Sequence, residues 1–482
     1  MFILLLTLNA AFNIGKSSHN NRFVRAGHFW PQSLSLIQAP RRRLGKKYFH
    51  KAKIMKKGFS EAFTRIFVYS YTSVIFLVVL NILSILCTSS AMQAQVSKQL
   101  FSMSMQSGVL YGQPWPNPSL GGVRLWNTQT SWPDISPTSS RYDWSTLDSW
   151  LRAANAHGAD VMYTFGRIPK WASSKPGDNT CRYGAGQCDP PNDLNRDGSG
   201  TNQHFRNFVT AIATHAAGRI KYWEIANEPQ NSFYWTGTIA QVVRMAKDAR
   251  SIILSIDPNA VLLSPGTGLR LNAVDWTAAY LAAGGGQYAD VIAFHGYVEG
   301  SCPSTLPDTS SIIPRVSVFR TMLAKYGQST KPLWNTEASW GHTSDTCFGN
   351  ADLQAGFVAQ MYLLYQTART QRLYWYAWNA SNAGALWNNK ILKPGLAYQQ
   401  VYKWLVGATI SSPCAMGSDS TWKCVITKPG GYQAEIVWNA KTSKLFIAPS
   451  QYHHYVDVYA NIFKLPVNGA VQIGFKPILL QP

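Results

Sequence analysis

The chain has 482 residues and a net charge of +21, but only 14% of its residues are charged. Its length allows one large domain plus a smaller one. Residues 1–60 hold twelve Lys or Arg and no Asp or Glu, so they carry +12 and the remainder carries +9. Because the body has no dense basic run, the charge argues against a nucleic-acid-binding protein. The 18 Trp, 23 Tyr and 21 Phe suit surfaces that stack on sugars, although large cores also use aromatic residues.

Residues 1–94 have the pattern of a targeting segment rather than of a folded domain. A basic, irregular stretch precedes an apolar run over residues 66–87, and the small residues of Ser90–Ala94 follow it. This order is typical of an export signal, with cleavage expected after Ala94. The apolar run is also about the ~20 residues that span a bilayer, so a single-pass anchor with the body outside is the alternative to secretion. Export signals rarely begin so far along a chain, so we expect Met55 to be the true start.

The seven cysteines divide into one in the apolar run, Cys87, and six in the body. An even number in an exported chain suggests disulfides. Two of the expected pairs close local loops, and the third would link adjacent loops on one face of the fold. The expected pairs are Cys181–Cys188, Cys414–Cys424 and Cys302–Cys347.

Between residues 95 and 410 the chain alternates short apolar strands with helical segments. We expect strands at Leu100–Met105, Gly122–Trp126, Asp160–Phe165, Ile220–Ala226, Ala260–Ser264, Asp290–His295, Pro332–Thr336 and Arg372–Trp378. We expect helices at Leu147–His157, Asn202–His215, Ile239–Ile256, Trp276–Ala283, Pro314–Tyr326, Leu353–Arg369 and Gly395–Gly407. The turn-rich stretch Ser107–Leu120 shows no helix. This alternation predicts an α/β protein with a (β/α)₈ TIM barrel. A doubly wound sheet is the alternative, but it usually has fewer strands, and the chain has no glycine-rich phosphate loop.

Residues 411–482 have a different pattern, with short strands separated by Gly, Pro and Asn turns. The expected strands are Trp422–Thr427, Tyr432–Trp438, Leu445–Ala448, Tyr455–Tyr459 and Val471–Phe475. They predict a small C-terminal β-sandwich domain packed beside the barrel. A structural cover is favoured over a carbohydrate-binding module.

Glutamate is scarce in this chain. The six glutamates are Glu61, Glu224, Glu228, Glu299, Glu337 and Glu435. Glu228 and Glu337 close aromatic-rich strands, where barrel enzymes place catalytic groups. Cleaving a glycosidic bond needs an acid for the leaving oxygen and a second carboxylate as nucleophile or base. We therefore predict a glycosidase with Glu228 as acid/base and Glu337 as nucleophile. A carboxyl separation of about 5–5.5 Å would mean retention of configuration, and ~6.5–9.5 Å would mean inversion.

The segment Trp223–Pro229 reads Trp-Glu-Ile-Ala-Asn-Glu-Pro, and Glu337 follows Glu228 by 109 residues. This pattern resembles clan A glycoside hydrolases, most of all the family 39 group, over about residues 100–410. The resemblance implies a retaining mechanism without a cofactor, and Asn227 as a hydrogen-bond donor to the sugar 2-hydroxyl. Ala226 stands where many relatives have tryptophan, which implies a roomier pocket.

Further substrate-binding candidates lie at other strand ends. Arg124 matches the clan's basic residue near the nucleophile, where it would hold Glu337 ionised, but an ion pair with Glu224 is the alternative. His295 and Tyr297 alternate onto one face, where they would orient Glu337 or the sugar unless His295 is a core residue. Trp378 resembles the clan's sugar-platform tryptophan. Other stacking candidates, with core packing as the alternative for each, are Trp126, Trp340, Trp171 and Trp375.

The loop Asp193–Gly198 copies the first half of a calcium site, but it is not expected to bind metal. The twelfth position is His204 instead of a glutamate, and Arg196 adds charge of the wrong sign. A surface loop pinned by a disulfide is the favoured interpretation. No His-Glu-x-x-His or Gly-x-Ser-x-Gly motif occurs. The sequence therefore predicts a secreted, monomeric, cofactor-free retaining glycosidase acting on a β-linked poly- or oligosaccharide. A transglycosylase and a non-catalytic sugar-binding protein are the alternatives.

Overall fold

The computed structural model describes residues 95–298, 308–341, 349–380 and 383–482. The chain divides into two compact units, Met1–Ser90 and Ala91–Pro482, and the described residues belong to the second. The apolar run 66–87, Met55 and the Cys302–Cys347 pair lie outside the described residues, so these predictions stay predictions. Among the helices of the described part, none is long and apolar enough to cross a membrane.

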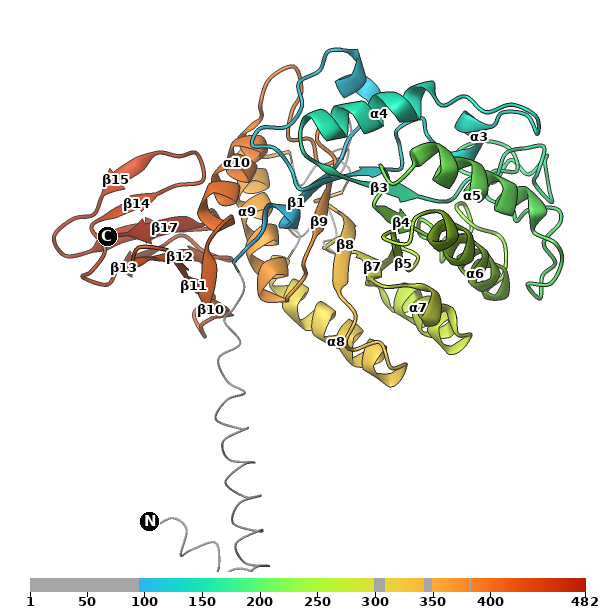
Figure 1. Ribbon diagram of the computed structural model, residues 1–482. Coiled ribbons are helices and arrows are strands. Elements are labelled where there is room, and N and C mark those ends of the chain that lie inside the picture. The colour runs from blue at the N-terminus through green and yellow to red at the C-terminus, as the bar shows by residue number, and fades with distance from the viewer. Residues whose placement is uncertain (1–94, 299–307, 342–348, 381–382) are drawn as a thin grey trace, which may run out of the picture. The chain divides into compact units, whose positions relative to one another are not determined.

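Parallel strands form the wall of a barrel (Figure 1). In the described residues they are β1 (Phe101–Ser104), β2 (Gly122–Leu125), β3 (Asp160–Thr164), β4 (Tyr222–Glu224), β5 (Val261–Leu263), β7 (Ile292–His295), β8 (Leu333–Ala338) and β9 (Leu373–Tyr376). Hydrogen-bonded neighbours run in the order β5-β4-β3-β2-β1-β9-β8-β7, and a parallel bridge between Leu263 and Val291 joins β5 to β7. The predicted TIM barrel is therefore confirmed. The sequence missed β6 (Thr267–Gly268), which pairs with β7, because two residues show no alternation.

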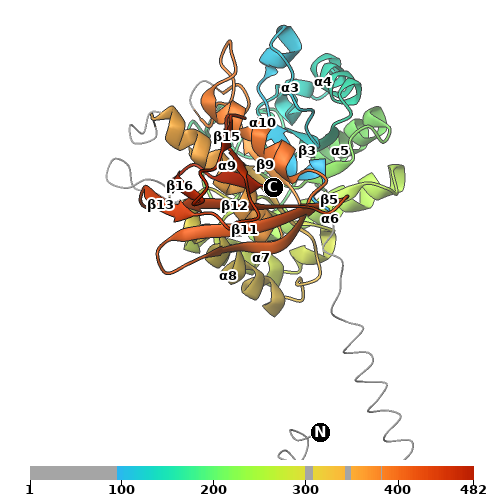
Figure 2. The same cartoon turned by 90° about the vertical axis from the view of Figure 1, so that its left-hand side faces the viewer.

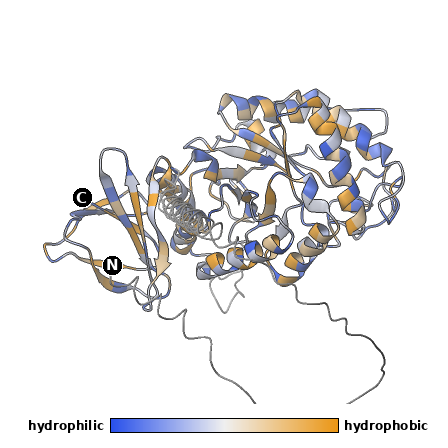
Figure 3. Ribbon diagram, turned by 60° about the horizontal axis from the view of Figure 1, so that its bottom comes forward, coloured by the Kyte–Doolittle hydropathy of each residue, from blue (hydrophilic) through white to orange (hydrophobic). Residues whose placement is uncertain are grey.

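Helices cover the outside of the barrel. They are α4 (Ser145–Ala156), α5 (Gln203–Ala216), α6 (Ile239–Ile256), α7 (Leu271–Ala282), α8 (Ile312–Lys325), α9 (Ala351–Thr367) and α10 (Lys393–Leu405), with the short α3 (Trp132–Ile135), η1 (Lys98–Leu100), η2 (Ser107–Tyr111), η3 (Gly285–Tyr288) and η4 (Thr309–Ser311). Hydrophobic and hydrophilic residues share each barrel helix (Figure 3), so one side packs inward. In α4 the buried positions follow helical spacing: Leu147, Trp150, Leu151 and Ala154. After β1 the 3₁₀ helix η2 replaces an α-helix, so the expectation of no helix there was wrong for one short turn.

The C-terminal strands form two sheets (Figure 2), which confirms the predicted β-sandwich. One contains β10 (Thr409–Met416), β11 (Thr421–Lys428), β12 (Tyr432–Asn439), β17 (Ile478–Gln481), β14 (His454–Val456) and β15 (Ile462–Lys464), and the other contains β13 (Lys444–Ile447) and β16 (Ala470–Ile473). The sequence missed β10, β15 and β17, because edge strands and short terminal strands carry weak alternation. The disulfide Cys414–Cys424 joins β10 to β11, as predicted.

Helix α9 lies against the C-terminal strands. Its Asp352 accepts hydrogen bonds from Tyr459 Oη at 2.6 Å and from Lys476 Nζ at 2.7 Å. Its Gln360 Nε2 donates to the carbonyl of Phe475 at 2.6 Å. Buried apolar residues of the barrel and of the C-terminal strands belong to one continuous cluster. The barrel and the sandwich thus share a core.

Candidate active site

A cavity of about 630 Å³ lies at the C-terminal ends of the barrel strands. Its walls include side chains that are far apart in the sequence but lie at or just beyond the ends of β2, β4, β7, β8 and β9. They include Trp126, Glu228, His295, Glu337 and Tyr376. In a TIM barrel this face carries the active site. The structure therefore brings both predicted carboxylates to the expected place.

The backbone after β4 turns sharply at Glu228. Strand β4 ends at Glu224, and a parallel bridge between Asn227 and Gly266 extends the pairing toward the cavity. Glu228 then adopts φ 44°, a left-handed conformation that few non-glycine residues take. Its N–H donates to the carbonyl of Gly266 at 2.8 Å, which offsets part of the strain. The carboxylate is thereby directed into the cavity instead of along the strand.

Both carboxylate oxygens of Glu228 have partners. His295 Nδ1 lies 2.8 Å from Oε1, and Asn231 Nδ2 donates to Oε2 at 2.9 Å. Burial raises the pKa of Glu228, but the hydrogen bond and charge of His295, together with Arg124 and Asn231, outweigh burial and leave the pKa below its usual value. Burial lowers the pKa of His295, but the charges of Glu337 and Glu228 raise it overall. The two shifts therefore favour the carboxylate form of Glu228 and the imidazolium form of His295.

Glu337 is held by a different pair of donors. Tyr297 Oη donates to Oε1 at 2.8 Å, and Arg124 Nη1 donates to Oε2 at 2.6 Å. Burial and then the charge of Glu337 raise the pKa of Tyr297 well above its usual value, so the phenol stays neutral. An arginine and a neutral phenol therefore each donate to one oxygen of this carboxyl group and fix its orientation toward the cavity.

Arg124 connects the catalytic layer to the barrel interior. Its side chain is 0% exposed, and it reaches Glu224 Oε2 through Nε at 2.8 Å and Asn227 Oδ1 through Nη2 at 2.8 Å. Burial lowers the pKa of Arg124, but Glu224 and Glu337 raise it above its usual value, so the guanidinium stays charged. The contacts that the two interpretations of this residue require are therefore both present, because one guanidinium binds Glu224 and Glu337 together.

One oxygen of Glu228, one oxygen of Glu337 and one nitrogen of His295 lie within 4.8 Å of one another. This proximity results from the barrel, since the three residues come from different strands. The model of the cellulase family, glycosyl hydrolase family 5, matches residues 124–384, more than half of the chain. The chain belongs to this family. The protein is therefore a glycoside hydrolase, and the resemblance to clan A is confirmed.

Solved structures share the fold of this glycoside hydrolase. A family 39 glycoside hydrolase from the gut symbiont Bacteroides cellulosilyticus aligns with a TM-score of 0.59 and 15% identity over 80% of this chain and 82% of that chain. A glucosidase from Croceicoccus marinus aligns with a TM-score of 0.55 and 14% identity over 80% of this chain and 96% of that chain. A family 39 β-xylosidase from Caulobacter crescentus aligns with a TM-score of 0.54 and 14% identity over 81% of this chain and 98% of that chain. No curated protein matches the chain.

The tryptophans of this glycoside hydrolase that were predicted to stack on sugar fall into two groups. Trp126 and Trp340 line the cavity. The second group is not among the described residues that line the cavity, and it comprises Trp378, Trp375 and Trp171. The indole N–H groups of these three donate, in the same order, to the carbonyls of Pro114, Gly384 and Ser136. Trp378 is only 2% exposed, because it lies two residues beyond the end of β9 and turns into the core.

Sequence reasoning missed Tyr376, which lines the cavity at the end of β9. Its hydroxyl accepts a hydrogen bond from Asn127 Nδ2 at 2.5 Å. Along a strand, alternate residues face opposite sides, so Trp375 faces the helices and Tyr376 faces the cavity. This alternation is the sequence pattern from which Tyr376 could have been predicted to face the cavity. Other lining residues that no sequence pattern indicated lie on loops, and they are Asn231, Tyr183 and Tyr234.

Neither metal-like arrangement in the described part of the chain points to an ion. In the site, protein donors already occupy the carboxylate oxygens. In the group Asp178, Cys181, Cys188 and Asp189, the two cysteines form a disulfide, as predicted. In the calcium-like loop, Arg244 Nη1 donates to the carbonyls of Gly198 and Gly200 at 3.1 and 3.0 Å. Arg244 thus binds two backbone carbonyl oxygens of the kind that would otherwise be ligands of a cation.

Proposed function

We propose that this glycoside hydrolase is an exported, retaining enzyme that cleaves a β-linked poly- or oligosaccharide by double displacement. The observation that carries the proposal is the approach within 4.8 Å of carboxylate oxygens from Glu228 and Glu337. Retaining enzymes keep their two carboxyl groups about 5–5.5 Å apart, whereas inverting enzymes need ~6.5–9.5 Å to admit water. The short gap favours direct attack by one carboxylate.

In the first step Glu337 attacks the anomeric carbon while the bond to the leaving oxygen breaks. Glu228 gives that oxygen a proton, which leaves a glycosyl ester on Glu337. In the second step Glu228 takes a proton from water, and the water oxygen displaces Glu337 from the anomeric carbon. Two inversions give net retention. An acceptor sugar in place of water would make the enzyme a transglycosylase.

His295 is the neighbour of Glu228 that can exchange a proton with it. Its Nδ1 lies 2.8 Å from Oε1, and the pKa of His295 is raised while that of Glu228 is lowered. A proton that passes from Nδ1 to Oε1 gives the neutral carboxylic acid that the leaving oxygen needs.

Asn227 supports binding of the sugar 2-hydroxyl. Its Oδ1 accepts from Arg124 Nη2 at 2.8 Å, which turns the amide so that Nδ2 is left to donate. The side chain is only 5% exposed, so a donor there acts in a dry environment. This arrangement fits the role that the resemblance implies.

The catalytic assignment is tested with the full-length protein and its Glu337→Gln variant on a panel of β-glucans, xylans and aryl β-glycosides. Nuclear magnetic resonance identifies the first anomer released. We expect the parent to release the β-anomer first and Glu337→Gln to release nothing. Glu435→Gln is the matched control, because Glu435 is also buried but lies on β12. An α-anomer released first would rule out retention, and activity in Glu337→Gln would rule out the nucleophile. Products longer than the substrate would favour transglycosylation.

Export is proposed from two observations. The N-terminal segment has the order of an export signal, and the described residues hold the disulfides Cys181–Cys188 and Cys414–Cys424, which fit an oxidising compartment. The intact mass of the native mature protein tests it. A chain that begins at Gln95 would support cleavage after Ala94. A membrane-bound chain that keeps residues 66–87 would replace secretion with anchoring.

A further inference from the structure

A second cavity lies between helix α10 of the barrel and the larger sheet of the sandwich. Its volume is about 170 Å³. Helix α10 contributes Gln400, Lys403 and Trp404 to its lining, and the sheet contributes side chains of β11, β12, β14 and β17, among them Lys428 and Gln481. We call this space the α10 cavity. It shares no described lining residue with the catalytic cavity.

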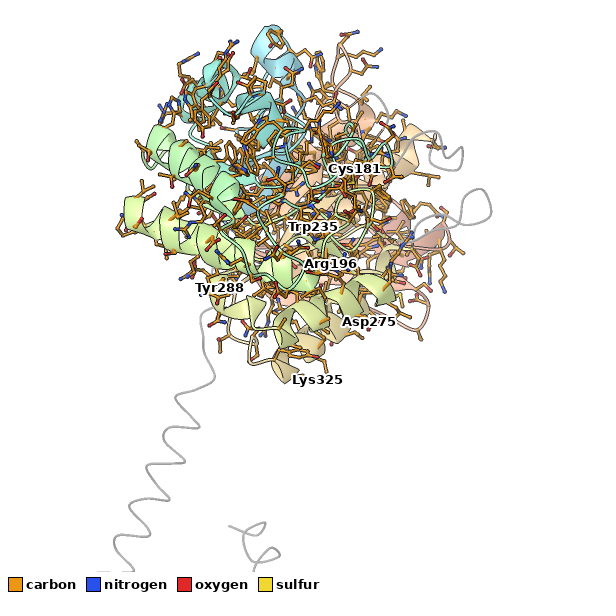
Figure 4. The ribbon with its side chains drawn as sticks, turned by 90° about the vertical axis from the view of Figure 1, so that its right-hand side faces the viewer. Cys181, Arg196, Trp235, Asp275, Tyr288 and Lys325 are labelled. Atoms are coloured by element: carbon orange, nitrogen blue, oxygen red, sulfur yellow. A yellow bond between two sulfur atoms is a disulfide. The ribbon has the colours of Figure 1, made fainter. Side chains whose placement is uncertain are left out.

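The α10 cavity lies away from the catalytic face of the barrel. All barrel strands run in the same direction, so the helix after a strand starts near the catalytic face and returns to the opposite face. Gln400 and Trp404 lie in the second half of α10. The side of the barrel that faces the viewer in Figure 4, where Trp235 is labelled, is the side opposite to the sandwich in Figure 1. A ligand in the α10 cavity would therefore leave the catalytic cavity free.

Polar side chains occupy part of the contact between α10 and the sheet. Alternate residues of a strand share one face, so Ile426 and Lys428 of β11 face α10 together, as do Leu479 and Gln481 of β17. Ile426 and Leu479 belong to the core that the barrel and the sandwich share. Lys428 and Gln481 continue the same two faces at the strand ends. A purely structural contact would have apolar side chains at these positions as well.

The amide of Gln400 lacks a partner inside this contact. Gln400 is 7% exposed, and its side chain forms no hydrogen bond with the described residues. The indole N–H of Trp404 is a second buried donor without a partner in the described part of the chain. A buried polar group destabilises a fold unless water or a ligand completes its hydrogen bonds. A polar ligand in the α10 cavity can complete those of Gln400.

The charge of the α10 cavity favours an anion. The described lining holds two lysines, Lys403 and Lys428, and no Asp or Glu. Lys428 Nζ donates to the carbonyl of Lys403 at 2.8 Å, which leaves two of its three donors for a ligand. Burial lowers the pKa of the Lys428 ammonium, and a carboxylate beside it would offset this effect. Hydrogen bonds between an ammonium and a carboxylate are among the strong ones in proteins.

The other polar groups of the lining match hydroxyl groups. The amides of Gln400 and Gln481 and the phenol of Tyr432 can each donate and accept, as a sugar hydroxyl does. Tyr432 Oη donates to Gln481 Oε1 at 3.3 Å, so Gln481 Nε2 is left to donate to a ligand. The volume of 170 Å³ is the space of about six water molecules at ~30 Å³ each, which admits one sugar ring.

We propose that the α10 cavity binds one sugar acid, with its carboxylate on Lys428 and its hydroxyl groups on Gln400, Tyr432 and Gln481. The source of this ligand is either a free sugar acid or a uronate unit at the end of a polysaccharide. Because the site lies outside the catalytic cavity, it does not depend on the proposed function.

Calorimetric titration tests the class of ligand. Full-length Glu337→Gln protein is used, so that hydrolysis adds no heat. The probes are D-glucuronate, D-glucose and acetate, which carry the ring with the carboxylate, the ring alone and the carboxylate alone. We expect D-glucuronate to bind at least about tenfold more tightly than the other two, because only D-glucuronate engages the lysine and the amides together. Methyl β-D-glucuronoside, whose anomeric oxygen is blocked as in a chain, binds equally if the source is a polysaccharide and more weakly if it is a free acid.

Substitutions in the same background locate the site. Lys428→Gln should weaken D-glucuronate binding at least about tenfold, and Gln400→Met, which keeps the length of the side chain, about fivefold. Lys423→Gln is the matched control and should leave the affinity unchanged. Lys423 is also on β11, but its Nζ lies 4.9 Å from the ring centre of Phe446 and it does not line the cavity. Thermal unfolding without ligand checks that each variant is folded, and Gln400→Met decides if Lys428→Gln is not.

The proposal is wrong if D-glucuronate does not bind, or if D-glucose or acetate binds as tightly. It is also wrong if Gln400→Met and Lys428→Gln leave the affinity unchanged, or if Lys423→Gln lowers it as much as they do. Hydrolysis of polysaccharides by the unsubstituted protein is measured separately, so this site and the proposed function can each fail without the other.

Discussion

At the scale of single residues, the site is a small set of buried ionisable groups in which carboxyl groups outnumber basic ones. Arg124 and His295 face the three carboxyl groups of Glu224, Glu228 and Glu337. The transition state of glycoside cleavage has oxocarbenium character and carries positive charge. A pre-ordered site rich in carboxyl groups suits that state better than the neutral substrate, which is the condition for catalysis.

Replacement of Arg124 by lysine tests whether the site needs a guanidinium that binds several side chains at once. Lysine keeps the charge but cannot bind Glu224, Glu337 and Asn227 at once. We expect kcat to fall by at least about a hundredfold and the free energy of unfolding to fall by about 3 kcal/mol.

Arg372→Lys is the matched control for Arg124→Lys. Arg372 is also buried and pairs with Asp160 at 2.7 Å. It directly precedes β9, and its guanidinium lies 4.5 Å from the ring centres of both Tyr222 and Trp334. It should lose stability in urea unfolding and keep kcat. An equal loss of kcat in both variants would attribute the effect to folding alone.

The pair of His295 and Glu228 makes stability depend on pH. The lowered pKa of Glu228 stabilises the fold above its ordinary value of 4.5, and this contribution is lost as pH falls through the lower folded value. The raised pKa of His295 contributes fully below 6.5 and is lost as pH rises through the higher folded value. We therefore expect His295→Gln to cost most between pH 4.5 and 6.5 in urea unfolding. A difference from the parent that stays constant from pH 3 to 9 would contradict this pairing.

At the scale of elements, the segment between β5 and β6 packs against the catalytic layer. Gly266 pairs with Asn227 through a parallel bridge, and its carbonyl accepts from Glu228 N–H. A Cβ at Gly266 would lie 2.6 Å from His295 Nε2 and 2.7 Å from Glu224 Oε1. The absence of a side chain is therefore what lets the backbone approach these two groups.

Gly266→Ala should reduce kcat more than it reduces stability. The added methyl group displaces His295 or Glu224 and so moves Glu228 or Arg124, and misplacement of about 1 Å can cost a hundredfold in rate. Gly177→Ala is the control, since a Cβ there meets nothing within 4 Å and the backbone has no positive φ. Steady-state kinetics and thermal unfolding of both variants provide the measurement. Unchanged kcat in Gly266→Ala would show that His295 and Glu224 can move to admit the methyl group without loss of activity.

At the scale of the whole molecule, the sandwich and the barrel depend on each other. Gly356 on α9 packs so closely on Phe475 that a Cβ would lie 2.6 Å from the ring. Asp352 on the same helix binds both Tyr459 and Lys476. Removal of the sandwich would expose an apolar helix face that is otherwise buried in the shared core.

Deletion of residues 409–482 should therefore give an aggregating or strongly destabilised barrel. Size-exclusion chromatography and thermal unfolding measure this, and Asp352→Asn is the milder companion, expected to lower Tm by a few degrees and to keep kcat. A soluble, fully active barrel without the sandwich would instead favour the carbohydrate-binding module over the structural cover.

The sequence by itself determined the repeat of strands and helices, because alternation and helical spacing are local consequences of burial on one side. It also pointed to Glu228 and Glu337, since scarce glutamates at strand ends are visible without coordinates, and to two disulfides whose cysteines lie close along the chain. Only the tertiary structure decided which aromatic residues face the cavity: Tyr376 instead of Trp378, and Tyr183 and Tyr234 from two separate loops. It also decided that Arg124 binds Glu224 and Glu337 together. These contacts join residues a hundred or more positions apart or depend on how the backbone turns after a strand ends, so no local pattern records them.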